Sequence, residues 1–435
     1  MSSIATQRKT DYSSLFTPAR IASARTFVAG LIMTILLVSF RPFQPGGAGN
    51  ILEGGDILNQ LGFSAVGAAS LLLMLSVVDR RVLLAFLSPW WAIMMLFVLL
   101  SVQHSLNPTA AVRAILFMMM GIIGILAVLS LNTGADGFSK VLLATGTTIL
   151  VLSYAGIFLL PDVARHTVFS EEPEHAGLWR GIYSHKNLAG PVMAGISFIG
   201  LYLFRRGMRI QGLLIGIAGL IFLANTGSKT SALLAPMVVL LVAGPGLFGM
   251  RGLASVGVFS TICIFAMATI GSVLFKPLHD LREAIAPGTT YTGRTELWKF
   301  AVENLSTRPF TGFGFESFWF TPMVYFGEKN IELEWDVRGA VHGHNGYLDI
   351  ALTMGIPALL AAMIALIIMP LIDYAQVQRS RENVLMADLF LMIFTFSALN
   401  SFLESFFFRR ADPVWLLFVM AVFGLRMVAR FNISK

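Results

Sequence analysis

The sequence predicts an all-α, polytopic integral membrane protein, and its composition and hydropathy pattern support that prediction. Of the 435 residues, 56% are hydrophobic and only 13% are charged, whereas a soluble domain carries roughly 25% charged residues. A helix that crosses a bilayer needs about 20 mostly apolar residues, and runs of this kind recur along the chain. The 40 glycines and 17 prolines are compatible with membrane helices, because neighbouring helices and water satisfy the backbone groups that they free.

We predict about 12 spans within a single transmembrane domain covering residues 1–435. The runs lie at residues 21–40, 61–78, 84–103, 112–130, 141–160, 188–204, 210–225, 231–248, 253–275, 345–370, 385–403 and 414–430. The first run ends in SFRPFQP with no small-residue cleavage site, so we interpret it as a retained span. Short basic connections alternate with connections that carry few positive charges, from Arg8 and Lys9 onwards. The positive-inside rule therefore predicts that both termini are cytoplasmic.

Charge and cysteine content narrow the function classes further. The net charge of +7 indicates membrane topology rather than nucleic-acid binding, because most lysines and arginines flank apolar runs. The single cysteine, Cys263, excludes an internal disulfide and a cysteine metal cluster. No P-loop, nucleophile elbow or dinucleotide fingerprint occurs in a suitable setting, so no nucleotide cofactor is expected.

Two outer loops, residues 161–187 and 276–343, are the expected location of function because they break the short-loop pattern and are rich in polar groups. The first ends in LWRGIYSHKN, which places Arg180, His185, Lys186 and Asn187 directly before a predicted helix. Arginine, lysine and a helix N-terminus all favour phosphate. Anchoring of the helix end at the membrane interface is the alternative.

The second loop contains GRTELWKFAVENLSTRP, in which apolar residues recur at helical spacing up to Pro309. Arg294 falls on the apolar face of this predicted helix. Two interpretations remain open: the side chain snorkels from the helix end, or it points into a site shared with the membrane domain. The aromatic residues of this loop either stack on sugars or form the core of the loop; they include Trp298, Phe315, Trp319 and Tyr325.

The stretch RGAVHGHNGYLDI places Arg338, His342, His344 and Asn345 before an apolar run. A histidine near its unperturbed pKa of about 6.5 is a natural proton acceptor. A structural histidine and half of a zinc site are the alternatives, although no HExxH pattern accompanies the pair.

One more basic pair, Arg409 and Arg410, stands at a predicted outer turn, against the topology bias. An ion pair between one of these arginines and Glu404, just upstream, is the structural interpretation; phosphate binding is the other.

Together these motifs resemble those of the bacterial O-antigen ligase and O-antigen or exopolysaccharide polymerase superfamily. The resemblance rests on the number of spans, the large loop between spans 9 and 10, and the segments RGIYSHKN, GRTELW, RPFTGFGFESFW and HGHNGYLDIALTMGIP. His344, Asn345 and Gly355 fit the ligase pattern. SHKNLAG and GFGFESFW look more similar to the exopolysaccharide polymerase branch.

The resemblance implies a GT-C type, metal-independent glycosyltransferase of the bacterial inner membrane, with its active site facing the periplasm and no cofactor. Its partners would be an undecaprenyl-diphosphate-linked oligosaccharide, an acceptor glycan, the bilayer, and chain-length or export proteins. His344 would be the general base, and Arg180 and Arg294 would neutralise the diphosphate. His342 and the other polar residues described above are expected in substrate binding: Lys186, His185, Asn187, Arg338, Asn345, Arg409 and Arg410.

Three competing functions remain open from the sequence. A ligase would transfer a finished glycan to lipid A core or to protein. A transporter of lipid-linked sugar usually binds its substrate near the midplane, whereas the polar residues here gather at one outer face. A non-catalytic assembly protein is the third.

Overall fold

The computed structural model describes residues 17–44, 56–169, 173–248, 250–291, 293–319, 321–326 and 336–435. Over these ranges the chain is helical, and its β-structure is one isolated bridge between Arg165 and Trp179. The predicted all-α fold class is therefore confirmed. The basic residues Arg8 and Lys9 lie outside the described residues.

Ten helical segments of the described chain are long and apolar enough to cross a membrane. Eight of them are single helices: α1 (Pro18–Val38), α3 (Ile57–Val77), α6 (Pro108–Leu131), α7 (Ala135–Leu159), α9 (Lys186–Arg206), α11 (Lys229–Leu247), α20 (Arg381–Asn400) and α21 (Pro413–Arg430). The other two are longer runs. Gly252–Leu274 begins with α12 (Gly252–Ala266), and Ile356–Ala375 begins with α18 (Ile356–Ala362) and ends with α19 (Met369–Ala375). Two further elements match the remaining predicted spans. Helices α4 (Arg80–Phe86) and α5 (Pro89–Ser101) form a pair bent by 59°, and α10 (Arg209–Asn225) is a shorter apolar helix.

The predicted span 345–370 is divided in the structure. Helix α17 (Gly346–Met354) ends at Gly355, and the membrane-length run starts only at Ile356. The break arises because Gly355 has φ +86° and ψ 166°, a conformation that a helix cannot contain. As a result, α17 belongs structurally to the large loop as well as to the bundle.

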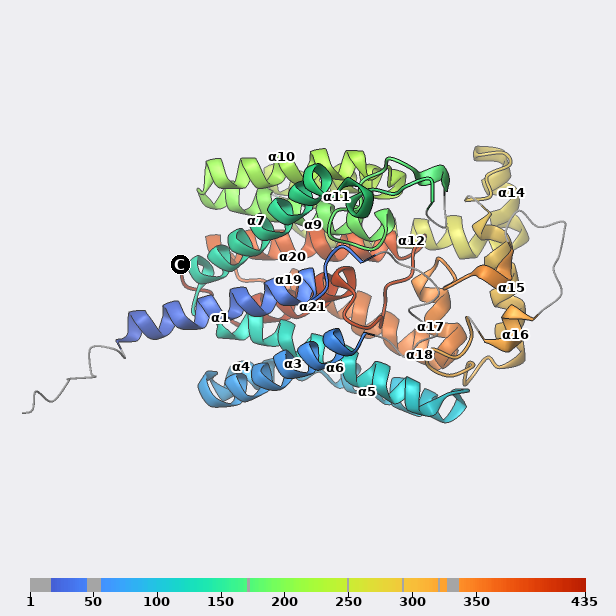
Figure 1. The fold of residues 1–435 in the computed structure, drawn as a ribbon, viewed down its shortest axis with the longest axis horizontal. Coiled ribbons are helices and arrows are strands. Elements are labelled where there is room, and N and C mark those ends of the chain that lie inside the picture. Colours follow the sequence, from blue (N-terminus) through green and yellow to red (C-terminus); the bar gives the residue numbers. More distant parts are fainter. Residues whose placement is uncertain are drawn as a thin grey trace, which may run out of the picture.

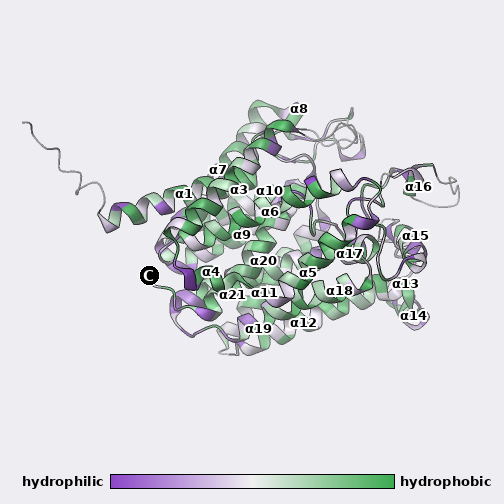
Figure 2. Cartoon of the chain, turned by 90° about the horizontal axis from the view of Figure 1, so that it is seen from below, coloured by the Kyte–Doolittle hydropathy of each residue, from purple (hydrophilic) through white to green (hydrophobic). Residues whose placement is uncertain are grey.

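Helices α20 and α21 form the centre of the bundle. In α20, 94% of the membrane-length segment is buried inside the protein, compared with 28% in α1. Figure 2 shows the apolar helices running between two more hydrophilic ends. The C-terminus lies at the end where α1 begins, and α14 (Lys276–Ile285), α15 (Arg294–Thr307) and α16 (Pro322–Tyr325) lie at the other (Figure 1). We call the second end the loop end.

The large loop has a small core of its own. Helix α15 confirms the helix predicted from GRTELWKFAVENLSTRP, and it packs on α17. This core contains Trp298, Ala301, Phe313, Phe318, Val324, Leu348 and Leu352. Trp298 and Phe315 are buried, so neither ring offers a face to a sugar, whereas Tyr325 is exposed.

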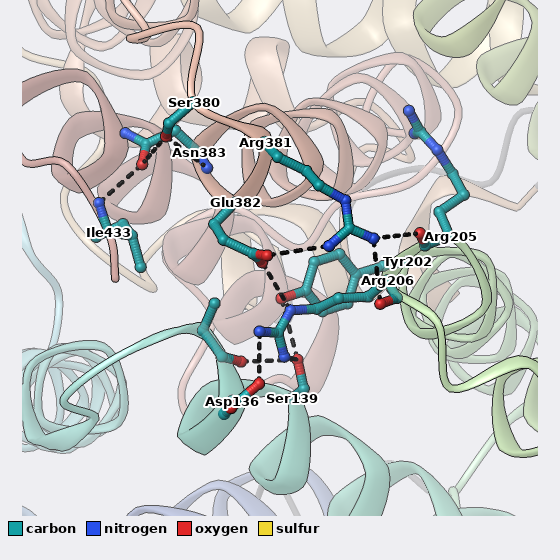
Figure 3. A network of polar contacts seen from close by, with 11 residues as sticks. Asp136, Ser139, Tyr202, Arg205, Arg206, Ser380, Arg381, Glu382, Asn383 and Ile433 are labelled. Carbon is teal, nitrogen blue, oxygen red and sulfur yellow. Dashed lines mark hydrogen bonds and ion pairs between the residues drawn. The ribbon is translucent and has the colours of Figure 1, made fainter. Parts of the chain in front are cut away.

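A network of ion pairs and hydrogen bonds fixes the helices at the opposite end (Figure 3). Arg206, at the end of α9, donates to Glu382 of α20 and to Asp136 of α7, at 2.8 and 2.7 Å. It also donates to the Ser139 hydroxyl at 2.8 Å. The side chains of Arg206 and Glu382 are only 5% and 12% exposed, so water screens this ion pair little and its loss is costly.

We expect Arg206→Ala to destabilise the protein by about 3 kcal/mol, the cost typical of breaking a buried ion pair. Thermal unfolding in detergent measures this effect. Arg209→Ala is the matched control, since Arg209 is exposed and follows the same helix. Equal melting temperatures for the two variants would contradict the assigned role of the network.

Candidate active site

The carboxylate of Glu404, in the turn after α20, is the meeting point of three distant segments. Arg294 Nη2 donates to Oε1 at 2.8 Å, and Asn187 Nδ2 donates to the same oxygen at 3.0 Å. His344 Nδ1 lies 3.2 Å from Oε2. Both long loops therefore meet the membrane bundle at this carboxylate, whose side chain is 14% exposed.

The sequence-based pairing of Glu404 with Arg409 or Arg410 is wrong. Arg410 forms an ion pair with Glu316, and Arg409 Nη1 donates to the Ser405 carbonyl at 3.2 Å. The side chain of Arg410 is 38% exposed and lies at the surface, whereas the side chain of Glu404 is 14% exposed. No motif in the sequence indicated a functional role for Glu404.

His344 is held in one orientation by the backbone on either side of it. The Gly343 amide donates to both oxygens of Asp349, at 3.1 and 3.0 Å, and Trp298 Nε1 donates to the Gly343 carbonyl at 2.9 Å. Asn345 caps α17 by accepting from the Leu348 amide. His344 itself has φ +48°, a conformation that costs a non-glycine residue free energy and persists only when its surroundings impose it.

The contact with Glu404 determines which nitrogen of His344 carries the proton. A neutral imidazole whose Nδ1 faces a carboxylate is protonated at Nδ1, so Nε2 keeps its lone pair. Burial raises the pKa of Glu404, but His344 and Arg294 outweigh burial and hold this pKa below its ordinary value. The pair is therefore an ionised carboxylate and a histidine with a basic Nε2, an arrangement suited to general-base catalysis.

His342 supports this arrangement as a neutral group. Its Nδ1 accepts from the His344 amide at 3.2 Å. Burial lowers the pKa of His342 well below its ordinary value, and the neighbouring His344, Arg409, Arg294 and His185 lower it further. At neutral pH His342 is thus uncharged and acts as a hydrogen-bond acceptor.

Three histidines surround the N-terminus of α9. His185 Nδ1 accepts from the Asn187 amide, and His166 Nε2 accepts from the Lys186 amide, both at 3.1 Å. The rings of His166, His175 and His185 offer ligand atoms within 4.8 Å of one another. However, when one nitrogen of a neutral imidazole ring accepts a hydrogen bond from an amide, the other ring nitrogen carries the proton. A metal ion would have to displace these helix caps, so the arrangement favours capping.

Arg180 differs from the other arginines of the site in its partners. Arg180 is 8% exposed, and its Nη1 donates to the Ser184 carbonyl at 3.0 Å. Burial lowers the pKa of its guanidinium. Within the described part of the chain no carboxylate lies at ion-pair distance from Arg180. A buried cation of this kind is an anion-binding group.

Two of the predicted substrate-binding arginines already have carboxylate partners on the surface. Arg338 makes a two-pronged contact with Asp336, at 2.9 and 2.6 Å, and Arg410 contacts Glu316. Neither contacts the Glu404 group. Asn345 is occupied as well, because its side chain caps α17 and donates to the Phe402 carbonyl at 3.0 Å.

These features define a class: a polytopic membrane protein with a polar site where two long loops meet the bundle. Residues 213–363 match the family model of the O-antigen ligases. The match confirms the resemblance predicted from the motifs and supports a membrane glycan-transfer function. No curated protein matches the chain. The matched region includes Arg294 and His344, whereas Arg180, Asn187 and Glu404 lie outside it.

The structure explains why a glycine occupies position 355 of the ligase-like pattern. A Cβ at this position would collide with the carbonyl oxygen of Phe310, and the Ile356 amide donates to the Pro309 carbonyl at 2.8 Å. The glycine thus lets the large loop close onto the end of α17, the helix that directly follows His344 and Asn345.

We expect Gly355→Ala to cost about 1–3 kcal/mol in backbone strain and to lose activity through displacement of α17. Gly207→Ala is the matched control: Gly207 has φ +110° but no atom near an added Cβ, so it isolates strain from collision. Melting temperature and transfer activity are the measurements. If both variants behave alike, the contact with Phe310 does not explain the glycine.

Proposed function

We propose that this protein transfers glycan from an undecaprenyl-diphosphate-linked oligosaccharide to a hydroxyl of an acceptor glycan, and so polymerises repeat units of exopolysaccharide or O-antigen. The reaction takes place at the loop end, which we assign to the periplasmic side of the bacterial inner membrane. The observation that supports the proposal is the contact of His344 Nδ1 with Glu404, 3.2 Å long. It leaves Nε2 as a base in a site built from both loops.

In this mechanism His344 Nε2 takes the proton of the acceptor hydroxyl while the oxygen attacks the anomeric carbon of the donor sugar. The bond from that carbon to the diphosphate oxygen breaks, and the electron pair leaves with the diphosphate. Arg180 and Arg294 stabilise the negative charge that develops there. Electrostatic stabilisation of this kind is often the largest catalytic contribution.

Lys186 and the start of α9 are further diphosphate-binding groups in this proposal. The Lys186 and Asn187 amides are taken by the caps from His166 and His185. The Lys186 ammonium and the positive dipole end of the helix are therefore the features that favour an anion here. Helix α9 begins at Lys186, two residues beyond Ser184, whose carbonyl binds Arg180. Arg409, beside Ser405, is assigned to the acceptor side. Chain-length and export proteins remain proposed partners.

A ligase that delivers finished glycan to lipid A core or protein is the second candidate, and the family match favours it by name. The two activities share the donor and the base and differ in the acceptor. A ladder of product lengths indicates a polymerase, and a single attachment indicates a ligase.

We expect purified protein to lengthen lipid-linked repeat units without nucleotide or added metal, and His344→Ala to abolish this activity because no base remains. Gel analysis of glycan size measures the reaction. His279→Ala, a half-exposed histidine of α14, is the control and should stay active. Activity that a chelator removes, or an active His344→Ala variant, would refute the mechanism.

We expect Arg180→Met to reduce transfer by about a hundredfold or more, the usual effect of losing one stabilising donor. Arg338→Met and Arg410→Met should change it only slightly, since Asp336 and Glu316 already hold these side chains. Initial rates at saturating and limiting donor test the difference. Equal losses in all three variants would argue against Arg180 as the diphosphate group.

A further inference from the structure

We propose that Glu404 is a positioning residue that couples donor binding to base activation: an incoming diphosphate draws Arg294 away, and Glu404 then serves His344 without a competing cation. The inference rests on the proposed function and adds a coupling between its two halves. It follows from the fact that one carboxylate binds both the proposed base and a proposed diphosphate group.

The two oxygens of Glu404 divide these tasks. Oε1 accepts from Arg294 at 2.8 Å and from Asn187 at 3.0 Å, and Oε2 faces His344 at 3.2 Å. If Arg294 departs, Asn187 still holds Oε1 from the first turn of α9. The carboxylate therefore keeps its orientation toward His344 Nδ1.

Arg294 is placed to change partners. It is the first residue of α15, so its side chain extends from a helix end. One of its other contacts, from Nη1 to the Tyr291 carbonyl, is 3.5 Å long, at the weak limit of a hydrogen bond. A diphosphate carries more charge than a carboxylate and can bind a guanidinium group through two hydrogen bonds, whereas Glu404 binds Arg294 through Nη2. A diphosphate can therefore compete for Arg294.

The charges around His344 explain why the exchange activates the base. Arg294 of α15 and His185 before α9 lower the pKa of Glu404. Together with Arg409 after α20 they also lower the pKa of His342, whose Nδ1 binds the His344 amide. Asp349 holds the preceding amide. A cation bound to Glu404 opposes the positive charge that His344 acquires in the reaction. Once Arg294 is neutralised by phosphate, the carboxylate stabilises that charge more strongly.

Glu404 takes part in the transfer step without gaining or losing a proton. The acceptor proton moves to His344 Nε2, the acceptor oxygen bonds to the anomeric carbon, and the diphosphate leaves with the electron pair. Glu404 accepts the Nδ1 hydrogen bond throughout and takes up no proton. It is accordingly distinct from the groups that contact substrate.

Glu404→Gln and Glu404→Asp test the role, with Glu316→Gln as the matched control. Glu316 is a carboxylate paired with Arg410 at the surface. We expect Glu404→Gln to lower kcat by about a hundredfold or more, because a carboxylate that orients a catalytic histidine is worth up to about ten-thousandfold in kcat. The change in donor KM should be much smaller, and the acidic limb of the pH–rate profile should move to lower pH. Glu404→Asp should restore part of the rate. An unchanged pH profile in Glu404→Gln would overturn the assignment.

A second measurement tests the coupling without relying on glycan transfer. The pH dependence of diethyl pyrocarbonate modification at His344, followed by mass spectrometry, is compared with and without undecaprenyl diphosphate. We expect the midpoint to rise by about one pH unit in the wild type and to stay fixed in Glu404→Gln. The same rise in both proteins would overturn the coupling. If the wild type shifts but transfers no glycan, the proposed function fails and the coupling stands.

Discussion

The buried carboxylate of Glu404 is the constraint on which the loop end depends. A buried charge is costly unless it is paired and fully hydrogen-bonded, and the partners here come from α9, α15 and the turn before α17. These segments can satisfy Glu404 only if both long loops fold back onto the bundle together. The same requirement that stabilises the loops therefore brings Asn187, Arg294 and His344 into one site.

Helix α20 carries a buried carboxylate at each end, and this fixes its position in the bundle. Glu382 in its first turn binds Arg206 of α9, and Glu404, four residues past its end, binds Asn187 of the same helix. Two polar contacts separated by the full length of α9 and α20 hold these helices in register. Apolar packing in a membrane gives little such specificity, because lipid is as apolar as the side chains.

The spans, the loops and α15 could be predicted because hydropathy and helical periodicity are local properties of the sequence. The contacts of Glu404 could not be predicted in this way, since its partners His344, Arg294 and Asn187 are 60, 110 and 217 residues away in the sequence. The nearby Arg409 and Arg410 looked like the natural partners, and this expectation was wrong. Likewise Arg180, Arg338 and Arg410 resemble one another in sequence, and only their contacts separate a buried cation from two paired surface arginines.

Sharing Arg294 between a carboxylate and a diphosphate also bears on how the catalytic cycle closes. After transfer, the lipid diphosphate keeps its negative charge and would remain bound to a site of fixed cations. Glu404 stays in place on Asn187 and offers Arg294 a partner at 2.8 Å in the empty site. Return of Arg294 to Glu404 thus offsets part of the free energy lost when the product leaves. A site whose cations were all as unpaired as Arg180 would bind the donor more tightly and release its product more slowly.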